Sequence, residues 1–256
     1  MKEGFVQTEY GRIHYVEHGT GKPLLLAHSG GASIHEFDHN YEHLSTRFRT
    51  ISWDLLGHGD SDALTQHMSV RDHARTAIAL LDHLGIASAS IAGCSIGGIL
   101  AVELGANFAD RIDRSIIVDM QLRPQQWWVD HFLMIESMFT DVTQSFDTVA
   151  PRFRALTDET LQRWNIDRAK AGAHSMMDVI WAVRDYDLMS AITQVKVPAL
   201  TILGEDGPSI DCFEDFQRLL PGGQVITLPH CGHFPMIDDP MAFGTALIDF
   251  LDTIKE

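Results

Sequence analysis

The chain has 256 residues, 45% of them hydrophobic and 21% charged, with a formal net charge of −16 at pH 7. These values are those of an ordinary globular protein and exclude a disordered, fibrous or membrane-spanning chain. The acidic balance argues against a nucleic-acid partner, because phosphate binding requires a basic surface. We therefore expect a small-molecule partner.

Targeting signals and cysteine patterns add little. The N-terminal segment lacks the apolar stretch of a signal peptide, and no run approaches the ~20 apolar residues of a membrane helix, so we expect a cytoplasmic location and no membrane partner. Cys94, Cys212 and Cys231 include no closely spaced pair and are interpreted as free thiols. We expect no metal and no cofactor. The oligomeric state stays open, a homodimer included.

Strand and helix patterns alternate along most of the chain. Residues 5–9 and 12–17 flank a Tyr10-Gly11 turn and predict an antiparallel hairpin. Five short apolar runs predict buried strands at residues 24–27, 51–53, 89–92, 115–118 and 199–203. Helical periodicity predicts helices at residues 70–84, 97–108 and 241–254. This alternation predicts an α/β fold, with a mixed but mostly parallel sheet covered by helices on both faces.

Residues 121–194 break the alternation, because their pattern is largely helical and rich in Trp, Met and Phe. We interpret them as a helical cap inserted into an α/β core of residues 1–120 and 195–256. Most of the apolar side chains are expected to pack the interior of the cap. A few must face the carboxyl ends of the strands, where open α/β sheets bind ligands. The candidates for substrate binding are Trp127, Trp128, Trp164 and Trp181.

The most specific local motif is Gly93-Cys94-Ser95-Ile96-Gly97, which follows a predicted strand and begins a predicted helix. In this context the motif is typical of a nucleophile elbow, a strained turn that presents Ser95 and needs small neighbours at Gly93 and Gly97. The backbone N–H of Ile96, at the start of the helix, is then placed to bind an oxyanion. A chance match in a loop is disfavoured by the flanking strand and helix.

Together with this elbow, further stretches make the chain resemble the α/β-hydrolase superfamily from the first hairpin to the last helix. Residues 25–31, Leu-Leu-Ala-His-Ser-Gly-Gly, resemble the oxyanion loop of that superfamily, which implies that the N–H of Gly30 is the second oxyanion donor. Ser29 replaces the usual glycine there. The resemblance also implies structural roles for His28 and for His58, which lies in the similar stretch at residues 54–61.

The stretch Cys231-Gly232-His233-Phe234-Pro235 resembles the loop that carries the catalytic histidine of the superfamily. His233 follows the last predicted strand and precedes the final helix, so Ser95 and His233 stand in the chain order expected of this fold. The resemblance therefore implies that His233 is the catalytic base. A histidine in a surface loop is the alternative.

The acid of the triad has two candidates. In most of the superfamily it follows the next-to-last strand as Gly-x-x-Asp, but here that stretch reads Gly-Glu-Asp-Gly at residues 204–207, so Asp206 comes one residue early. Asp119 follows the strand after the elbow helix, where certain esterases, zearalenone-type lactonases and cofactor-free ring-cleaving dioxygenases carry their acid. Either strand end can supply a carboxylate that orients an imidazole. We favour Asp119.

A second literal motif is His35-Glu36-Phe37-Asp38-His39, which matches the H-E-x-x-H pattern of zinc proteases, with His43 four residues further on. We reject zinc catalysis, because Asp38 occupies an inner position that metalloproteases fill with apolar residues, and because the segment follows the oxyanion loop. We expect instead a group of histidines that is solvated or lies at the edge of a pocket.

The leading functional hypothesis is a serine hydrolase that cleaves a carboxylic ester or lactone of a neutral, hydrophobic substrate, aromatic or macrocyclic, through an acyl-enzyme. A serine at the elbow disfavours dehalogenases and epoxide hydrolases, which use a carboxylate nucleophile. The alternatives are a cofactor-independent ring-cleaving dioxygenase, a C–C bond hydrolase of the same fold, and a ligand receptor with slow turnover.

Overall fold

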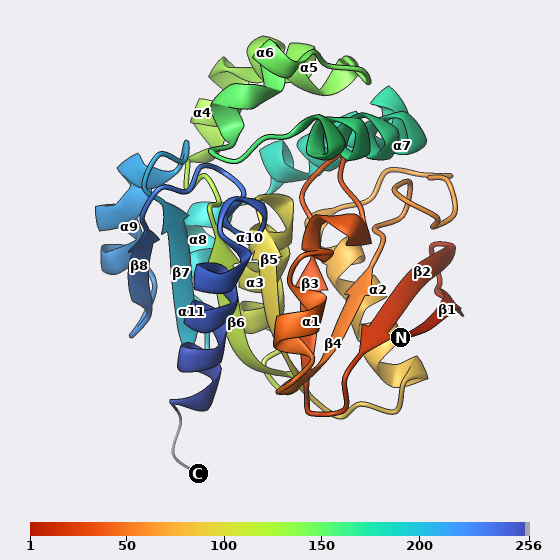
Figure 1. Ribbon diagram of the computed structural model, residues 1–256, viewed down its shortest axis with the longest axis vertical. Helices are drawn as coiled ribbons and strands as arrows, with labels where there is room; N and C mark the ends of the chain where they lie inside the picture. Colours follow the sequence, from red (N-terminus) through yellow and green to blue (C-terminus); the bar gives the residue numbers. More distant parts are fainter. Residues whose placement is uncertain (254–256) are drawn as a thin grey trace.

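The computed structural model describes residues 1–253 and contains one sheet of eight strands in the order β1-β2-β4-β3-β5-β6-β7-β8 (Figure 1). The strands are β1 (Lys2–Gln7), β2 (Arg12–His18), β3 (Lys22–Ala27), β4 (Phe48–Trp53), β5 (Ala89–Cys94), β6 (Ile112–Val118), β7 (Ala199–Gly204) and β8 (Gln224–Leu228). β1 pairs antiparallel with β2, and β2 with β4, whereas every other pairing is parallel. The predicted mixed, mostly parallel sheet is confirmed.

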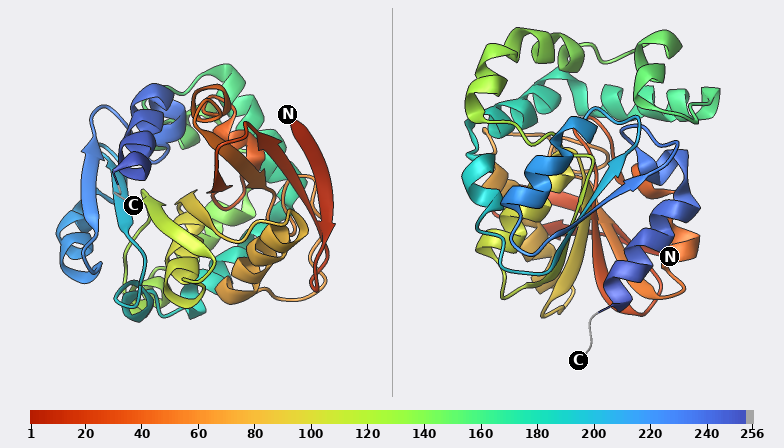
Figure 2. Two further views of the ribbon diagram at one scale, coloured as in Figure 1. Left: turned by 90° about the horizontal axis from the view of Figure 1, so that it is seen from below. Right: turned by 90° about the vertical axis from the view of Figure 1, so that its left-hand side faces the viewer.

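Helices cover both faces of this sheet (Figure 2). They are α1 (Tyr41–Leu44), α2 (Val70–His83), α3 (Ile96–Asn107), α8 (Leu188–Ile192), α9 (Phe213–Leu219), α10 (Pro235–Asp238) and α11 (Pro240–Asp252). α2 begins with a capping box, in which the Ser69 hydroxyl accepts from the N–H of Asp72 and the Asp72 carboxylate accepts from the N–H of Ser69. The predicted end of the last helix, Ile254, lies outside the described residues.

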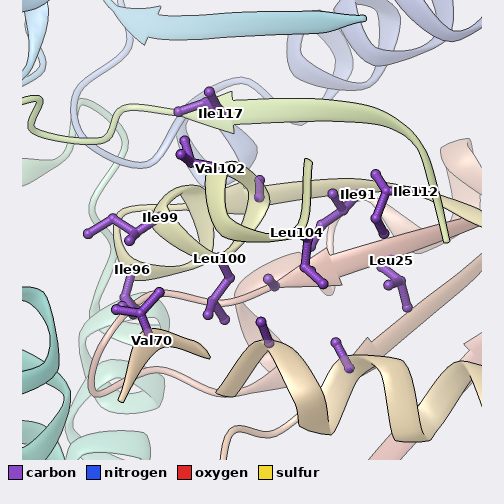
Figure 3. Packing of buried hydrophobic residues seen from close by; sticks show 14 of the residues in the cluster. Leu25, Val70, Ile91, Ile96, Ile99, Leu100, Val102, Leu104, Ile112 and Ile117 are labelled. Carbon is purple, nitrogen blue, oxygen red and sulfur yellow. The ribbon is translucent and has the colours of Figure 1, made fainter. Parts of the chain in front are cut away.

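Side chains of the central strands alternate between two hydrophobic clusters, one on each face. On β3, Leu25 belongs to the cluster formed with α2 and α3, whereas Leu24 and Leu26 belong to the cluster formed with α1 and α11. Figure 3 shows strand and helix residues of the first cluster packed together, among them Leu25, Ile91, Ile117, Ile99 and Leu100. The three cysteines are buried and free, as predicted.

The cap lies over the carboxyl ends of the parallel strands (Figure 1). It contains α4 (Gln125–Asp130), α5 (Phe132–Thr140), α6 (Phe146–Val149), the short 3-10 helix η2 (Ala150–Arg152) and α7 (Asp158–Asp185). α7 bends at Gly172, whose φ of 70° lies in the left-handed region that favours glycine. α8 falls within the segment predicted as cap, but it packs with α3 in the core through Leu188 and Ile192. Among residues 1–253, no helix is both long and apolar enough to cross a membrane.

Candidate active site

Ser95 lies on a strained turn between β5 and α3, with φ 56° and ψ −114°. Its N–H donates to the carbonyl of Val118 at 3.1 Å, which fixes the turn against the neighbouring strand. A Cβ at Gly93 would lie 2.2 Å from the Gly97 carbonyl oxygen, and one at Gly97 would lie 2.1 Å from the Ala27 carbonyl oxygen. The turn therefore tolerates only glycine on either side of the serine, and the geometry is that of a nucleophile elbow.

Asp119 and His233 meet beyond the ends of β6 and β8. The His233 Nδ1 and the Asp119 Oδ2 are 2.5 Å apart, and the Asp119 side chain is fully buried. Burial raises the pKa of Asp119, and the imidazole of His233 opposes this rise. The pair holds one imidazole nitrogen on the carboxylate, which leaves the other nitrogen for proton transfer.

Asp206, the other candidate for the acid, is placed differently. Its side chain is 44% exposed, and its carboxylate accepts from the Arg154 Nε at 2.8 Å. The neighbouring guanidinium lowers the pKa of Asp206. Of the two carboxylates that the sequence leaves open, the structure brings Asp119 to His233.

Gly207 occupies the position at which most of the superfamily carries the acid, and it lies against the Asp119 carboxylate. A Cβ at Gly207 would lie 2.5 Å from the Asp119 Oδ1. Any side chain at residue 207 would therefore compete for the space that Asp119 fills. The glycine after β7 and the carboxylate after β6 are therefore sterically linked.

The predicted oxyanion donors, the N–H groups of Gly30 and Ile96, belong to residues that line one cavity with Ser95. Glu36 forms hydrogen bonds with the predicted oxyanion loop. In the sequence, this residue belongs only to the rejected metal motif. Both the N–H and the hydroxyl of Ser29 donate to the Glu36 Oε2, at 3.1 and 2.5 Å. Ser29, in place of the usual glycine, thus fixes this loop to a buried carboxyl group.

The two histidines interpreted as structural, His28 and His58, are both buried. The His28 ring bridges the Ser29 carbonyl and the N–H of Leu55. The His58 Nδ1 lies 3.3 Å from the Leu56 carbonyl oxygen, and burial lowers the pKa of His58 to about 3. Both rings serve the scaffold and are absent from the lining of the cavity.

The cavity has a volume of about 400 Å³, within the range of small-molecule sites. Ser95 and His233 line it, and the other lining residues are mainly apolar, among them Ile99, Met120, Ile135, Phe139, Val179 and Ile180. Three of the four candidate tryptophans line it: Trp127, Trp128 and Trp164.

Trp181 is the exception and requires a correction. It does not line the cavity but packs against Ile135, Met177 and Ile180 inside the cap. One residue along a helix turns the side chain by about 100°, so the helix that points Ile180 toward the cavity directs Trp181 past it. Trp181 is therefore not supported as a substrate-binding residue.

Comparison with known proteins agrees with this geometry, since residues 24–245 match the model of the family described as the alpha/beta hydrolase family. The chain belongs to this family. It is 24% identical over 231 residues to 3-oxoadipate enol-lactonase 2 of Acinetobacter baylyi, covering 88% of this chain and 86% of that protein. It is also 24% identical over 253 residues to a pimeloyl-[acyl-carrier protein] methyl ester esterase of Vibrio vulnificus. That match covers 93% of this chain and 97% of that protein.

Among solved structures, the enol-lactonase from Burkholderia xenovorans LB400 superposes with a TM-score of 0.82 at 24% identity, covering 97% of this chain and 99% of that one. At this identity the likeness supports the fold. Family membership makes the protein a hydrolase of the α/β-hydrolase fold.

The H-E-x-x-H segment of this hydrolase does not converge on one point. Residues Ile34–Phe37 form a 3-10 helix, in which Glu36 is buried, whereas His39, three residues after Glu36, is exposed. His35 pairs with Asp38 instead, at 2.9 Å. The segment contributes Glu36 to the oxyanion loop and leaves His39 toward solvent.

Within residues 1–253, three potential metal ligands lie close together at His14, Asp54 and Asp60. The Asp54 carboxylate is already engaged, because it accepts from the His14 ring at 2.8 Å and from the N–H groups of Ile34 and Asp60 at 2.9 and 3.0 Å. This network ties β2 to the loops after β3 and β4, which is a structural role.

Two arginines of the cap, Arg152 and Arg168, also line the cavity of the hydrolase, and sequence analysis singled out neither. Burial lowers the pKa of both, that of Arg168 to about 10. In the sequence, each of them is simply an arginine within an apolar helical segment. Arginines on the surface of a helix show the same pattern, so the sequence does not distinguish the two.

Proposed function

We propose that this hydrolase cleaves a carboxylic ester or lactone through an acyl-enzyme on Ser95. The observation that carries the proposal is the Asp119–His233 pair, whose histidine lines one cavity with Ser95 and with the residues of both oxyanion donors. These are the groups that acyl transfer requires: a nucleophile, an oriented base and donors for a developing oxyanion.

In the proposed reaction, His233 takes the proton of Ser95 as the hydroxyl oxygen attacks the carbonyl carbon of the substrate. The N–H groups of Gly30 and Ile96 stabilise the tetrahedral oxyanion. His233 then gives the proton to the leaving alkoxide, which remains attached to the acyl chain when the substrate is a lactone. A water molecule, deprotonated by His233, attacks the acyl-enzyme and regenerates Ser95 with release of the acid.

Two further observations support this reaction class. The cavity walls are mainly apolar, which fits a hydrophobic portion of an ester or lactone. The chain is also similar over most of its length to one protein named as an enol-lactonase and to another named as a methyl ester esterase. We carry ester and lactone cleavage from those proteins to this chain as part of the proposal.

The test is proton release in a pH-stat from a panel of aliphatic esters, aryl esters and small and macrocyclic lactones. Wild type is compared with Ser95→Ala and with Ser45→Ala, a control that removes a hydroxyl from the exposed end of α1. We expect release from wild type and from the control, and a loss of at least about 10³-fold in Ser95→Ala.

Two added substrates separate the rival reactions. A 1,5-diketone reports C–C bond hydrolysis, and oxygen uptake with an aromatic hydroxyquinolone reports ring cleavage by a dioxygenase. Turnover confined to either of these, with no ester or lactone cleaved, would refute the proposed function. The ratio of lactone to open-chain ester rates then assigns the preferred substrate class.

A further inference from the structure

Arg152 and Arg168 line the cavity without an ionic partner. Within residues 1–253, neither guanidinium lies within 4.0 Å of a carboxylate oxygen. Neighbouring arginines of the cap are paired, Arg154 with Asp206 at 2.8 Å and Arg163 with Asp167 at 2.7 Å. A desolvated cation without a counter-charge is costly, so an unpaired guanidinium inside a cavity points to a bound anion.

The two guanidiniums differ in how far the protein satisfies them. Arg168 is fully buried, and its Nη2 donates at 2.7 Å to the carbonyls of Met138 and Asp141. It therefore ties α7 to the end of α5. Arg152 has one contact of this kind, from its Nη1 to the Gln144 Oε1 at 3.5 Å, the outer limit of a hydrogen bond. Since a guanidinium carries five N–H donors, most of those of Arg152 remain for a ligand.

Trp164 holds both guanidiniums over its ring, with centroid distances of 5.5 Å to Arg152 and 5.4 Å to Arg168. Such cation–π contacts fix the position of a guanidinium but do not neutralise its charge. The indole N–H donates to the Gln144 Oε1 at 3.1 Å, so Trp164, Gln144 and Arg152 form one connected group. Arg152 is thus held in place in the cavity wall and is not a mobile surface side chain.

Arg152 is also joined to the catalytic loop. Its backbone carbonyl accepts from the N–H of His233 at 2.7 Å. Arg152 also lines the same cavity of about 400 Å³ as Ser95. An anion bound by Arg152 is therefore part of the molecule whose carbonyl reaches Ser95, and not a ligand of a separate site.

We infer that the ester or lactone cleaved by this hydrolase carries a carboxylate, which binds to the Arg152 guanidinium in the cap wall of the cavity. This inference rests on the proposed function. A single negative charge matches the cavity, because only one of its two arginines, Arg152, has most of its N–H donors free. A carboxylate also matches the shape of a guanidinium, because the two planar groups pair through two parallel hydrogen bonds. The neutral substrate expected from the sequence followed from the acidic net charge and the apolar cap. The cavity lining, however, includes two arginines, and the Asp206 carboxylate that also lines it is already paired with Arg154.

The turnover test compares monoethyl esters of straight-chain dicarboxylic acids, from succinate to suberate, with the same ethyl esters ending in a primary amide. The acid and the amide have nearly the same shape and differ in charge. For wild type we expect kcat/KM to be at least about tenfold higher for the acid, with an optimum at one chain length that reports the distance from Ser95 to Arg152. In Arg152→Gln we expect this acid-to-amide ratio to fall at least about tenfold, mainly through a higher KM for the acid. In Arg152→Lys, which keeps the positive charge, we expect a ratio between those of Arg152→Gln and wild type.

The matched control is Arg184→Gln, which removes one positive charge from α7 of the cap, at an arginine that is paired with Asp185 and lies outside the cavity lining. The acid-to-amide ratio should stay at its wild-type value in this variant. An equal loss in both variants would show that net charge and not a binding site sets the preference, and would overturn the inference. A series ending in a phosphonate forms a further arm, and preference for the phosphonate over the carboxylate would overturn the carboxylate assignment.

Binding separates this inference from the proposed function. Isothermal titration calorimetry of the half-esters with Ser95→Ala measures binding without turnover. We expect Kd to be at least about tenfold higher for the double variant Ser95→Ala/Arg152→Gln than for Ser95→Ala. If no ester or lactone is cleaved but this binding difference is found, the proposed function fails and the anion site stands. If esters are cleaved in a Ser95-dependent way and acid and amide bind and react alike, the anion site fails and the proposed function stands.

Discussion

The core and the cap differ in how they satisfy the polar groups around the cavity. In the core, Asp119 is paired with His233, and Glu36 with Ser29, so each ionisable group that supports the chemistry has its partner within the protein. In the cap, Arg152 has a single long contact to an amide. The core thus pairs one oxygen of each of these carboxyl groups without a ligand, as a preorganised site would need, whereas Arg152 in the cap keeps donors that a ligand could use.

The largest expected effect tests the pairing in the core. Asp119→Asn should lower kcat by about 10⁴-fold, because an amide at this position no longer holds the imidazole in the tautomer that accepts the serine proton. Asp206→Asn removes a carboxylate that is exposed and paired with Arg154, and it should change kcat less than about threefold. Steady-state kinetics on the best ester or lactone of the panel measure both.

Circular dichroism and thermal unfolding of the two variants verify that each is folded. If Asp206→Asn caused the large loss and Asp119→Asn the small one, the assignment of the triad acid would be wrong, and with it the view that the core completes its own pairs.

Much of the core could be predicted from the sequence, because its signals are local. Buried strands appear as short apolar runs, and the elbow requires glycines at Gly93 and Gly97 that stand two residues from Ser95. The choice between Asp119 and Asp206 stayed open, since it depends on a contact between the ends of two strands. The decisive feature is the space above Gly207, which the Asp119 carboxylate fills.

The cap was less predictable for the same reason. Its helical periodicity is visible, but which face of each helix meets the cavity depends on how the helices pack, and Trp181 was consequently misplaced. Arg152 carries no local pattern that separates a cavity arginine from one at the surface. Glu36 was assigned to a chance metal motif, because its contact with Ser29 depends on a turn whose shape the sequence does not specify.

An intermediate effect is expected at Gly207, where the core leaves no room for a side chain. Gly207→Ala should lower kcat by about 10²-fold, because a Cβ 2.5 Å from the Asp119 Oδ1 must displace the carboxylate or the loop that carries the glycine. Gly222→Ala is a matched control, since a Cβ there meets nothing within 4 Å, although its φ of 64° predicts a modest loss of stability. Kinetics together with thermal unfolding separate the two effects.

The same contact predicts a partial rescue. In Asp119→Ala the space above residue 207 is vacant, so adding Gly207→Asp places a carboxylate after β7 and should recover at least about tenfold of the lost kcat. No recovery in a folded double variant would show that the contact between Gly207 and Asp119 is incidental to the placement of the acid.

The smallest expected effect concerns the carboxyl group beneath the oxyanion loop. Burial raises the pKa of Glu36 from an ordinary value of 4.5 to about 8. Between these two values the unfolded chain loses the proton while the folded protein keeps it, so the free energy of unfolding falls as the pH rises, and the loss is complete above about pH 8. Glu36→Gln, which resembles the protonated acid, removes this contribution.

We therefore expect wild type to lose on the order of 2 kcal/mol more stability than Glu36→Gln between pH 5 and pH 9, measured by urea unfolding at several pH values. Glu42→Gln, on the exposed side of α1, should follow the wild-type curve. Parallel curves for wild type and Glu36→Gln would show that Glu36 is ionised in the folded state. The oxyanion loop would then be bound to a buried carboxylate that has no cationic partner. The core, like the cap with Arg152, would contain a charged group without an ionic partner.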